Sequence, residues 1–197
     1  MRPVTVIKVG GSLARSDAAA RLLRALAERR ISDLLIVPGG GEFADSVRTA
    51  QARQALSDGA AHHMALLAMH MLAIALADLA PACVLAEGPE QFDAAWRSGN
   101  TPVWLPASMV LASADIPASW DVTSDSLAAW LAGQVDAKHL VLVKSGTLSV
   151  DGRDVRALTD AGIVDPCFAR FVEGRRFEWQ VVSGVEAALQ ALSNTGT

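Results

Sequence analysis

The amino-acid sequence predicts an α/β fold in which helices cover both faces of a mainly parallel sheet. Short apolar runs rich in valine and isoleucine recur along the 197 residues, and stretches with helical periodicity lie between most of them. Consecutive apolar positions without polar alternation are typical of strands covered on both faces, and strands that alternate with helices form parallel sheets. The chain is long enough for one large domain or two closely joined lobes.

Six strands and five helices are expected from this pattern. The strands are Val4–Val9, Leu34–Val37, Cys83–Ala86, Val103–Leu105, Leu140–Val143 and Trp179–Val182. The helices are Ala18–Arg30, Phe43–Leu56, Asp58–Leu79, Asp125–Leu131 and Val185–Leu192. The first has apolar residues at helical spacing, the second follows a glycine cluster, and the third opens with a cap at Ser57 or Asp58. Between Ser145 and Gly174 the sequence predicts the least regular region, with a turn-rich loop at SGTLSVDGRD.

The composition argues against several classes of protein. A formal net charge of −4 with 19% charged residues provides no basic surface for nucleic acid or an anionic membrane. Cys83 and Cys167 lack the spacing of a zinc site or a disulfide framework, so both are expected to be reduced and buried. The N-terminus enters a strand without a basic-then-apolar leader, which predicts a cytoplasmic protein.

The apolar stretch from Ala60 to Leu79 is the one candidate for a membrane span in the sequence. Three histidines and Asp78 interrupt it, so its uninterrupted apolar run is shorter than the roughly 20 residues that a bilayer requires. We expect a helix buried on nearly all sides, in the core or at a subunit interface of a homo-oligomer. His63 and His70 share a face of this helix, and hydrogen-bonded packing is favoured over metal binding for them.

Two glycine clusters follow the first two predicted strands. Lys8 stands near the end of the first strand, before Gly10–Ser12, and Gly39–Gly41 follows the second. Glycines let backbone N–H groups approach an anion, and a following helix N-terminus adds partial positive charge. Either cluster alone could be explained without a ligand. Lys8 would then extend from the end of its strand to solvent, and the glycines would only form turns. Their recurrence after consecutive strands favours a phosphate site at the carboxyl edge of the sheet.

Two other phosphate motifs can be tested directly on the sequence. The GxxxxGK[ST] pattern of P-loop proteins is absent. The residues Gly39–Ala44 match the dinucleotide pattern GxGxxG/A, but that pattern requires an acidic residue at the end of the next strand, about 20 residues later. A predicted helix occupies this interval instead. A nicotinamide cofactor is therefore disfavoured.

A second polar cluster occurs later in the chain. Asp121, Thr123, Ser124 and Asp125 precede or begin a helix, although one capping residue would be sufficient. Lys144 repeats the pattern of Lys8, since it ends an apolar strand and is followed shortly by glycine. Two lysines and an aspartate suit phosphoryl transfer: the cations would stabilise the developing charge, and the carboxylate would orient a lysine or bind Mg²⁺.

The segments IKVGGS, IVPGGG, SDSLAAWLA and LVLVKSG, in this order, resemble the amino-acid kinase superfamily. The resemblance covers nearly the whole chain. It implies a three-layer αβα sandwich with a mainly parallel sheet in a single domain over 1–197. The acceptor would bind over residues 1–121 and ATP, with Mg²⁺, over residues 122–197. It also implies that Lys8 and Lys144 stabilise the transferred phosphoryl group and that Asp125 organises them.

The resemblance extends to the binding residues. Those expected at the acceptor are Gly10, Gly11, Ser12, Gly39, Gly40, Gly41, Asp121 and Ser124, and those at the nucleotide are Lys144, Ser145, Gly146, Ser183 and Gly184. The family typically has an Asp-Gly pair shortly after the second lysine. Here Asp151 and Gly152 come several residues later, so the assignment of the nucleotide-binding loop is left open. No metal ligand is assigned, apart from Asp125 as a candidate.

A narrower resemblance lies in ALSDGAAHHMALLAMHM and DIPASWDVTSDSLAAWLA, which are similar to the [5-(aminomethyl)furan-3-yl]methyl phosphate kinases. It implies transfer of the γ-phosphoryl group of ATP to a phosphomonoester in methanofuran- or methylofuran-type cofactor biosynthesis. The ammonium group of that acceptor would require a carboxylate, with Asp121 or Glu42 as candidates. The alternatives are a kinase of another small carboxylate or phosphate acceptor, and an oxoanion (molybdate-type) storage or regulatory protein on the same fold.

Overall fold

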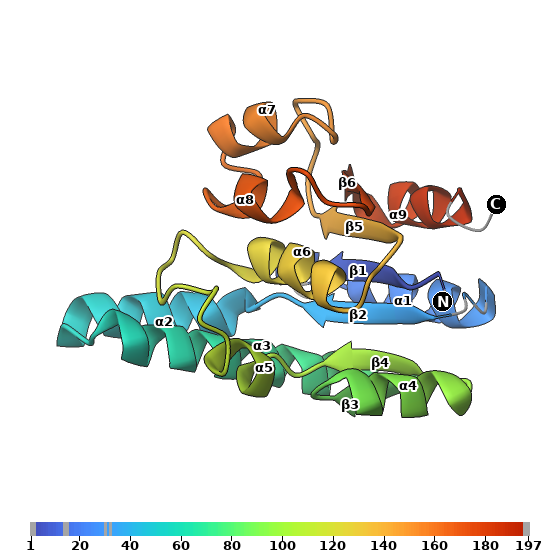
Figure 1. Ribbon diagram of the computed structural model, residues 1–197, viewed down its shortest axis with the longest axis horizontal. Coiled ribbons are helices and arrows are strands. Elements are labelled where there is room, and N and C mark those ends of the chain that lie inside the picture. The colour runs from blue at the N-terminus through green and yellow to red at the C-terminus, as the bar shows by residue number, and fades with distance from the viewer. Residues whose placement is uncertain (1–2, 14–15, 30, 32, 195–197) are drawn as a thin grey trace.

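The computed structural model describes residues 3–13, 16–29, 31 and 33–194, which form a three-layer α/β/α arrangement (Figure 1). Its six strands are all parallel, in the order β3-β4-β2-β1-β5-β6. They are β1 (Thr5–Val9), β2 (Leu34–Pro38), β3 (Cys83–Ala86), β4 (Thr101–Trp104), β5 (His139–Lys144) and β6 (Glu178–Ser183). All six predicted strands are confirmed, with ends that differ by at most two residues.

The burial of the strands explains why their sequences carry no polar alternation. Every residue of β1 and β2 is buried, and so are the four central residues of β5, because helices cover both faces of the sheet. The edge strand β3 is less covered, and its Leu85 is exposed. Its Cys83 and the distant Cys167 are both free and half-buried, rather than fully buried as predicted.

Helices form the two outer layers of the sandwich. They are α1 (Ala18–Arg29), α2 (Gly41–Gln54), α3 (Asp58–Asp78), α4 (Pro89–Arg97), α5 (Ala107–Leu111), α6 (Ser124–Gln134), α7 (Val155–Asp160), α8 (Phe168–Val172) and α9 (Gly184–Ser193). Apolar residues of α1, α9 and the second half of α3 pack on one face of the sheet, and those of α4, α6 and α8 pack on the other. The predicted end of the first helix, Arg30, lies outside the described residues.

Four of these helices were not predicted: α4, α5, α7 and α8. They are five to nine residues long, too short for helical periodicity to be distinguished from a loop. Two of them, α7 and α8, lie within the region 145–174 that was expected to be irregular. Local signals were nevertheless present, because Pro89 stands at the first position of α4 and the side chain of Asp154 accepts a hydrogen bond from the N–H of Ala157 in α7.

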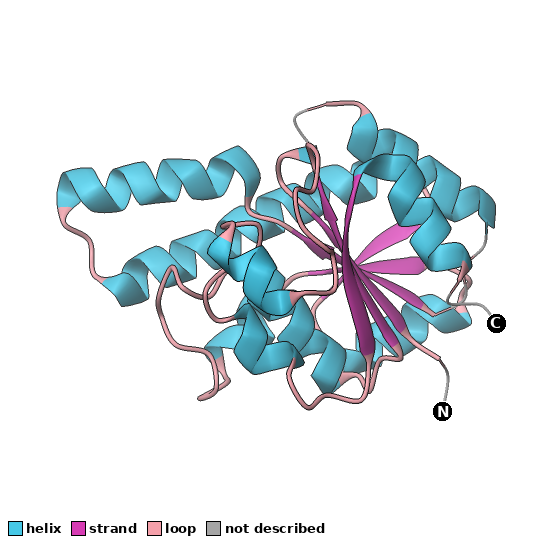
Figure 2. Ribbon diagram, turned by 90° about the horizontal axis from the view of Figure 1, so that it is seen from above, coloured by secondary structure: helices cyan, strands magenta, loops and turns pink. Residues whose placement is uncertain are grey.

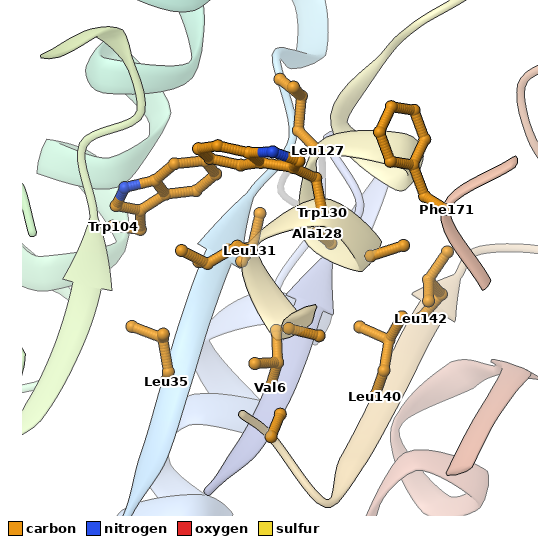
Figure 3. Close-up of a cluster of buried hydrophobic side chains, with 14 of the residues drawn as sticks. Val6, Leu35, Trp104, Leu127, Ala128, Trp130, Leu131, Leu140, Leu142 and Phe171 are labelled. Atoms are coloured by element: carbon orange, nitrogen blue, oxygen red, sulfur yellow. The ribbon is translucent and has the colours of Figure 1, made fainter. Parts of the chain in front are cut away.

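The helix α6 lies at the centre of the larger core cluster. All eight residues from Asp125 to Ala132 are buried, and small residues allow the helix to approach the sheet closely. Figure 3 shows its leucines above Val6 and Leu35, beside the stacked rings of Trp104 and Trp130, whose centroids are 6.2 Å apart. The first turn of α6 therefore has little freedom to move, which matters because it carries Asp125.

The long helix α3 extends with α2 beyond the sheet as a helical hairpin (Figure 2). Within the described residues, α3 is the helix long and apolar enough to span a membrane by length and composition. One face packs on the sheet, but Met64, Leu67, Met71 and Ile74 form an exposed stripe, with Leu67 47% and Ile74 56% exposed. Of the two expected places for α3, burial in the core of a single chain is therefore wrong, because only one face of α3 meets the sheet, and the subunit interface stays a prediction.

Candidate active site

The two lysines that were predicted to be catalytic lie close together, at the point where the direction in which strands are added to the sheet reverses. After β1 the chain moves outward through β2 toward the β3 edge, and it later returns to place β5 on the other side of β1. Lys8 is the fourth residue of β1, and Lys144 is the last residue of the adjacent β5. The crevice beyond the carboxyl ends of strands at such a reversal is where α/β proteins bind their ligands.

Asp125 lies between the two lysines. The Lys8 ammonium pairs with Oδ1 of Asp125 at 2.7 Å, by charge and without a well-aligned hydrogen bond, while Lys144 donates a hydrogen bond to Oδ2 at 2.6 Å. The side chains of Lys8 and Asp125 are 5% and 6% exposed, and that of Lys144 is 18% exposed. We call these three residues the Lys–Asp–Lys triad. The three positions predicted to be catalytic thus come together.

The electrostatics of the triad follow from one carboxylate serving two cations. Burial alone would raise the pKa of Asp125, but the two ammonium groups outweigh burial and hold that pKa below its ordinary value. Burial and the positive charge of Lys8 lower the pKa of Lys144 to about 8, against the opposing effect of Asp125. The triad holds one more positive charge than negative in a poorly solvated place, so a phosphate oxygen would be stabilised there.

The glycine clusters bring two loops into backbone contact. A Cβ atom on Gly11 would overlap the backbone of Gly41, and a Cβ on Gly39 would lie 2.6 Å from the backbone nitrogen of Gly11. Gly41 has a φ of +55°, which glycine adopts without strain. A Cβ on Gly40 would instead meet the side chain of Ala44. Contact between loops and with α2 therefore accounts for these glycines.

The same contact places a free helix end beside Lys8. Helix α2 begins at Gly41 without a side-chain cap, so the N–H groups of its first turn are available to an anion. Ser12 and Gly11 from the first loop line the same cavity as Gly40 and Gly41. The phosphate site predicted from the two glycine clusters is thus geometrically possible, although the glycines themselves are explained by packing.

A cavity of about 370 Å³ opens between the triad and the α2–α3 hairpin. Of the residues predicted for catalysis and for the acceptor, those that line it are Lys8, Gly11, Ser12, Gly40, Gly41, Ser124, Asp125 and Lys144. Gly10 and Gly39 do not line it. Gly10 is bonded through its N–H to the carbonyl of Val143 in β5, and Gly39 through its N–H to the carbonyl of Val9 in β1.

Asp121, the first candidate for an ammonium partner, does not line the cavity either. It is exposed, and its carboxylate accepts a hydrogen bond from the hydroxyl of Ser119 at 3.1 Å. Glu42 is exposed on α2 and is likewise absent from the cavity wall. Asp45 on α2 and Asp58 at the start of α3 line it instead. The sequence favoured Asp121 because it is close to Asp125 in the chain, but α6 begins between them and the two side chains diverge.

One wall of the cavity was not predicted from the sequence. The guanidinium group of Arg48 lies 3.8 Å from the ring centroid of Trp120, and the indole N–H donates to Oε1 of Gln51 at 2.6 Å. The amide of Gln51 in turn donates to Oδ1 of Asp58 at 2.9 Å. These contacts join the loop before α6 to the α2–α3 hairpin. No spacing rule would have paired residues some 70 positions apart, such as Trp120 and Gln51.

The residues predicted to bind the nucleotide lie at the ends of β5 and β6. Lys144 at the end of β5 pairs with Ser183 of β6 in the parallel register. Ser145 and Gly146 follow β5, and Gly184 begins α9. Apart from Lys144, they lie outside the cavity wall. Gly152 packs against β6 instead, where its carbonyl accepts a hydrogen bond from the N–H of Val181 at 2.8 Å. The displaced Asp-Gly pair is thus next to β6.

The three histidines of α3 occupy different environments. Nε2 of His70 accepts a hydrogen bond from the N–H of Ala107 at the start of α5, and burial lowers the pKa of His70. His63 is exposed, while His62 lines the cavity and also has a pKa lowered by burial. The hydrogen bond of His70 agrees with the predicted packing role.

The site offers few side-chain ligands for Mg²⁺. Both oxygens of Asp125 are occupied by lysines, and the described residues contain no group of three or more histidine, cysteine or acidic side chains that could hold a metal ion. Mg²⁺ keeps several water ligands and commonly binds through substrate phosphates. The residues present therefore fit a metal ion that is held mainly by the nucleotide, and not one held by a protein cage.

Comparisons with known proteins agree with this geometry. A model of the "Amino acid kinase family" matches residues 3–152. The chain is 26% identical to the [5-(aminomethyl)furan-3-yl]methyl phosphate kinase of Methanocaldococcus jannaschii over 196 residues, which covers 91% of this chain and 87% of that protein. Among solved structures, uridylate kinase from Archaeoglobus fulgidus superposes with a TM-score of 0.73 at 15% identity, covering 96% of this chain and 95% of the other.

An isopentenyl phosphate kinase shares the same fold, with a TM-score of 0.61 at 12% identity over 97% of this chain and 96% of that one. The family match spans both glycine loops, α6 and the strand that ends at Lys144, so it contains every member of the triad. The all-parallel sheet and its covering helices are the predicted architecture. The chain belongs to the amino acid kinase family and is an ATP-dependent kinase.

Proposed function

We propose that this kinase transfers the γ-phosphoryl group of ATP to a small phosphomonoester, which thereby becomes a diphosphate. The observation that carries the proposal is the buried Lys–Asp–Lys triad, with its excess positive charge, at the floor of a cavity of about 370 Å³. The acceptor phosphate lies over the uncapped start of α2 and Lys8, in the lobe of residues 1–121. ATP lies over Lys144, Ser145, Gly146, Ser183 and Gly184, in the lobe of residues 122–197, and brings Mg²⁺ with its phosphates.

The charge state of Asp125 favours an acceptor that is already ionised. Its pKa is held low and both of its oxygens are engaged, so it is poorly placed to remove a proton from an alcohol. A phosphomonoester has a second pKa of about 6 and needs no base at neutral pH. An acceptor oxygen then attacks the γ-phosphorus, the new P–O bond forms, and the bond to the ADP oxygen breaks while the lysines stabilise the charge.

The specific acceptor in this proposal is [5-(aminomethyl)furan-3-yl]methyl phosphate, on the pathway to a furan-containing cofactor in the cytoplasm. Support comes from the relative named above and from the chemistry of the cavity wall. Trp120 offers an indole for a flat ring, and the carboxylates of Asp45 and Asp58 lie on the α2–α3 hairpin. A buried ammonium group needs such a partner.

Asp58→Asn tests this assignment. We expect the KM for the aminomethyl compound to rise about tenfold or more, because a hydrogen bond to a charged group contributes about 1.5–3 kcal/mol. The KM for an analogue with methyl in place of aminomethyl should not change. Asp121→Asn, outside the cavity, is the matched control and should leave both KM values unchanged. The KM for each compound is obtained from the rate of ADP release as the concentration of that compound is varied.

Three outcomes separate the parts of the proposal. Equal losses for both compounds in Asp58→Asn would assign Asp58 to the fold of the hairpin. An effect of Asp121→Asn alone would return the ammonium site to the sequence-based candidate. If the wild-type enzyme accepts other phosphomonoesters but not the furan phosphate, the furan acceptor is rejected and the phosphotransfer proposal is retained.

The pKa of Lys144 predicts how activity depends on pH. Because the lysine stabilises charge only when protonated, kcat/KM for ATP should fall as pH rises through about 8, the pKa of Lys144 in the free enzyme. Bound phosphates favour the ammonium form, so the fall in kcat should occur at higher pH. The chain has three lysines, so an NMR titration of their side chains can assign this pKa. A Lys144 side chain that titrates at the ordinary lysine value of 10.5 would contradict the prediction.

The exposed stripe on α3 supports a homo-oligomer. Leu85 on β3 and Leu111 on α5, two elements that contact α3, are exposed as well. Exposed apolar side chains that gather on one helix face mark an interaction site, and we expect a second copy of the chain to cover the stripe. Leu67→Glu should produce monomers that remain folded, since Leu67 is already 47% exposed in one chain. Light scattering at micromolar concentration measures the mass.

The control for this substitution is Ala52→Glu, which adds the same charge to an exposed position of α2 away from the stripe. It should leave the oligomer intact. A wild-type protein that is monomeric at this concentration would contradict the expected interface.

A further inference from the structure

A buried carboxylate outside the triad, Asp165, holds the first turn of α6. Asp165 lies in the connection between α7 and α8 and is 7% exposed. Its Oδ2 accepts hydrogen bonds from the N–H of Thr123 at 2.9 Å, the hydroxyl of Thr123 at 2.8 Å and the N–H of Ser126 at 3.0 Å. Its Oδ1 accepts a short hydrogen bond from the hydroxyl of Ser126. Four donors from α6 and its cap thus converge on one side chain.

Asp165 replaces a local cap. Thr123 stands at the N-cap position of α6, but its side chain does not bond to the helix as an N-cap side chain ordinarily would. Its hydroxyl points to Asp165 instead, 42 residues further along the chain. The N–H groups at the start of a helix need acceptors when they are buried. Here a distant segment supplies the acceptor, so the start of α6 depends on how α7 and α8 are placed.

The positions that Asp165 holds lie on either side of Asp125. Thr123 precedes Asp125 by two residues and Ser126 follows it by one. The same connection makes a second contact, because the N–H of Cys167 donates to the carbonyl of Asp121 at 3.1 Å. The α7–α8 connection therefore fixes the backbone on both sides of the carboxylate that binds Lys8 and Lys144.

We propose that Asp165 is a positioning residue for phosphoryl transfer, which sets Asp125 between the two lysines by fixing the first turn of α6. The inference rests on the proposed function, because the triad is taken as the site of transfer. It assigns to the α7–α8 connection a role in aligning the active site, although no residue of that connection lines the cavity. Asp165 touches neither the cavity nor the lysines directly, so it acts through Asp125.

The electrostatic surroundings are consistent with a structural carboxylate of this kind. Burial and the nearby negative charge of Asp125 raise the pKa of Asp165, and its hydrogen bonds from Ser126 and Thr123 oppose that rise. The negative charge of Asp165 also favours the protonated form of Lys144. Positioning and charge are therefore both available to Asp165, and the experiment has to separate them.

Asp165→Asn and Asp165→Ala separate hydrogen bonding from charge. Asparagine can still accept both N–H groups through its carbonyl oxygen and donate to the Ser126 hydroxyl, whereas alanine removes all four contacts. We expect Asp165→Ala to lower kcat by about 10²-fold, as small displacements of a catalytic constellation do, with KM values changed by less than about threefold. Asp165→Asn should recover at least about tenfold of that loss.

Two controls show whether the effect passes through Asp125. Asp154→Ala removes another capping aspartate from the same region, at exposed α7, and should lower the melting temperature without changing kcat. In an Asp125→Asn background, adding Asp165→Ala should change kcat by less than about twofold, since residues that act as a unit are not additive. A full additional loss in that background would overturn the proposal.

Amide hydrogen exchange tests the contacts without any turnover. The amides of Thr123 and Ser126 should lose protection in Asp165→Ala and regain it in Asp165→Asn. If the wild-type enzyme transfers no phosphoryl group, the proposed function fails, but this exchange result still reports on the contacts.

If Asp165→Ala does not fold, Ser126→Ala, which removes one buried donor, should lower kcat severalfold with unchanged KM. Wild-type kcat in Ser126→Ala or in a folded Asp165→Ala would overturn the positioning role.

Discussion

Lys8→Met and Lys144→Met are each expected to lower kcat by about 10²–10³-fold, the usual effect of removing one electrostatic stabiliser from a preorganised site. Methionine keeps most of the length and the apolar volume of lysine, so the loss reports on the charge and not on a cavity. Lys138→Met is the matched control, because Lys138 is exposed at the opposite end of β5. Steady-state rates at saturating ATP and acceptor measure the effect.

These lysine variants should not lose stability. Two ammonium groups share one buried carboxylate, and each of the two pairs is 2.7 Å or shorter. Removing one lysine leaves a balanced ion pair and relieves the repulsion that lowers the pKa of Lys144. The melting temperature is therefore expected to stay the same or to rise. Near-normal turnover in either folded variant would remove that lysine from the mechanism.

Asp125→Asn should have the opposite effect on stability while lowering kcat by at least about 10²-fold. The change leaves two buried cations without their shared anion, and removing one partner of a buried ion pair destabilises a protein by about 3–5 kcal/mol. Asp125 is also the group that raises the pKa of Lys144, so Lys144 should release its proton at lower pH in this variant. The release of this proton removes one of the two unpaired charges and so limits the loss of stability.

The pH dependence of the melting temperature checks the Asp125→Asn prediction. The difference between wild type and variant should be largest near pH 6, where both lysines are charged. It should shrink toward pH 9, because a neutral Lys144 no longer repels Lys8. Equal melting temperatures at pH 6 would contradict a triad with two charged lysines.

The sheet and the triad could be predicted because short, local sequence patterns indicate both. A lysine at the end of an apolar strand, as in β5, or one residue before its end, as in β1, is conspicuous over a few residues. The carboxyl ends of parallel strands meet at one edge, so the two lysines had to converge once the strand order was that of the family. Asp125 was found because its cluster contains more polar residues than a helix cap needs.

The cavity wall and the support of the triad depend on contacts that no local pattern encodes. Trp120 is joined to Gln51 across 69 residues, and Asp165 to Ser126 across 39. Asp121 was assigned to the acceptor because it is close to Asp125 along the chain, yet its side chain stays at the surface. Short helices such as α7 and α8 were missed because too few turns exist to show periodicity.

The structure gives the glycines of the two loops a packing role that the sequence did not predict. Both clusters were expected to be glycine so that a phosphate could approach the backbone. In the structure, the missing side chains of Gly11 and Gly39 let one loop approach the other. Close approach is required in either case, but in the structure its partner is the second loop, and the proposed anion site is the uncapped start of α2 beside that contact.

The measurement that tests the central claim most directly is phosphorus NMR of the wild-type enzyme with ATP, Mg²⁺ and [5-(aminomethyl)furan-3-yl]methyl phosphate. The proposed reaction predicts equal amounts of ADP and of a new diphosphate with two mutually coupled phosphorus signals, and Lys8→Met should produce neither at a comparable rate. ADP with inorganic phosphate alone would show hydrolysis without transfer. Tight loading of molybdate or phosphate without any consumption of ATP would contradict a phosphotransferase and support an oxoanion-binding protein on this fold.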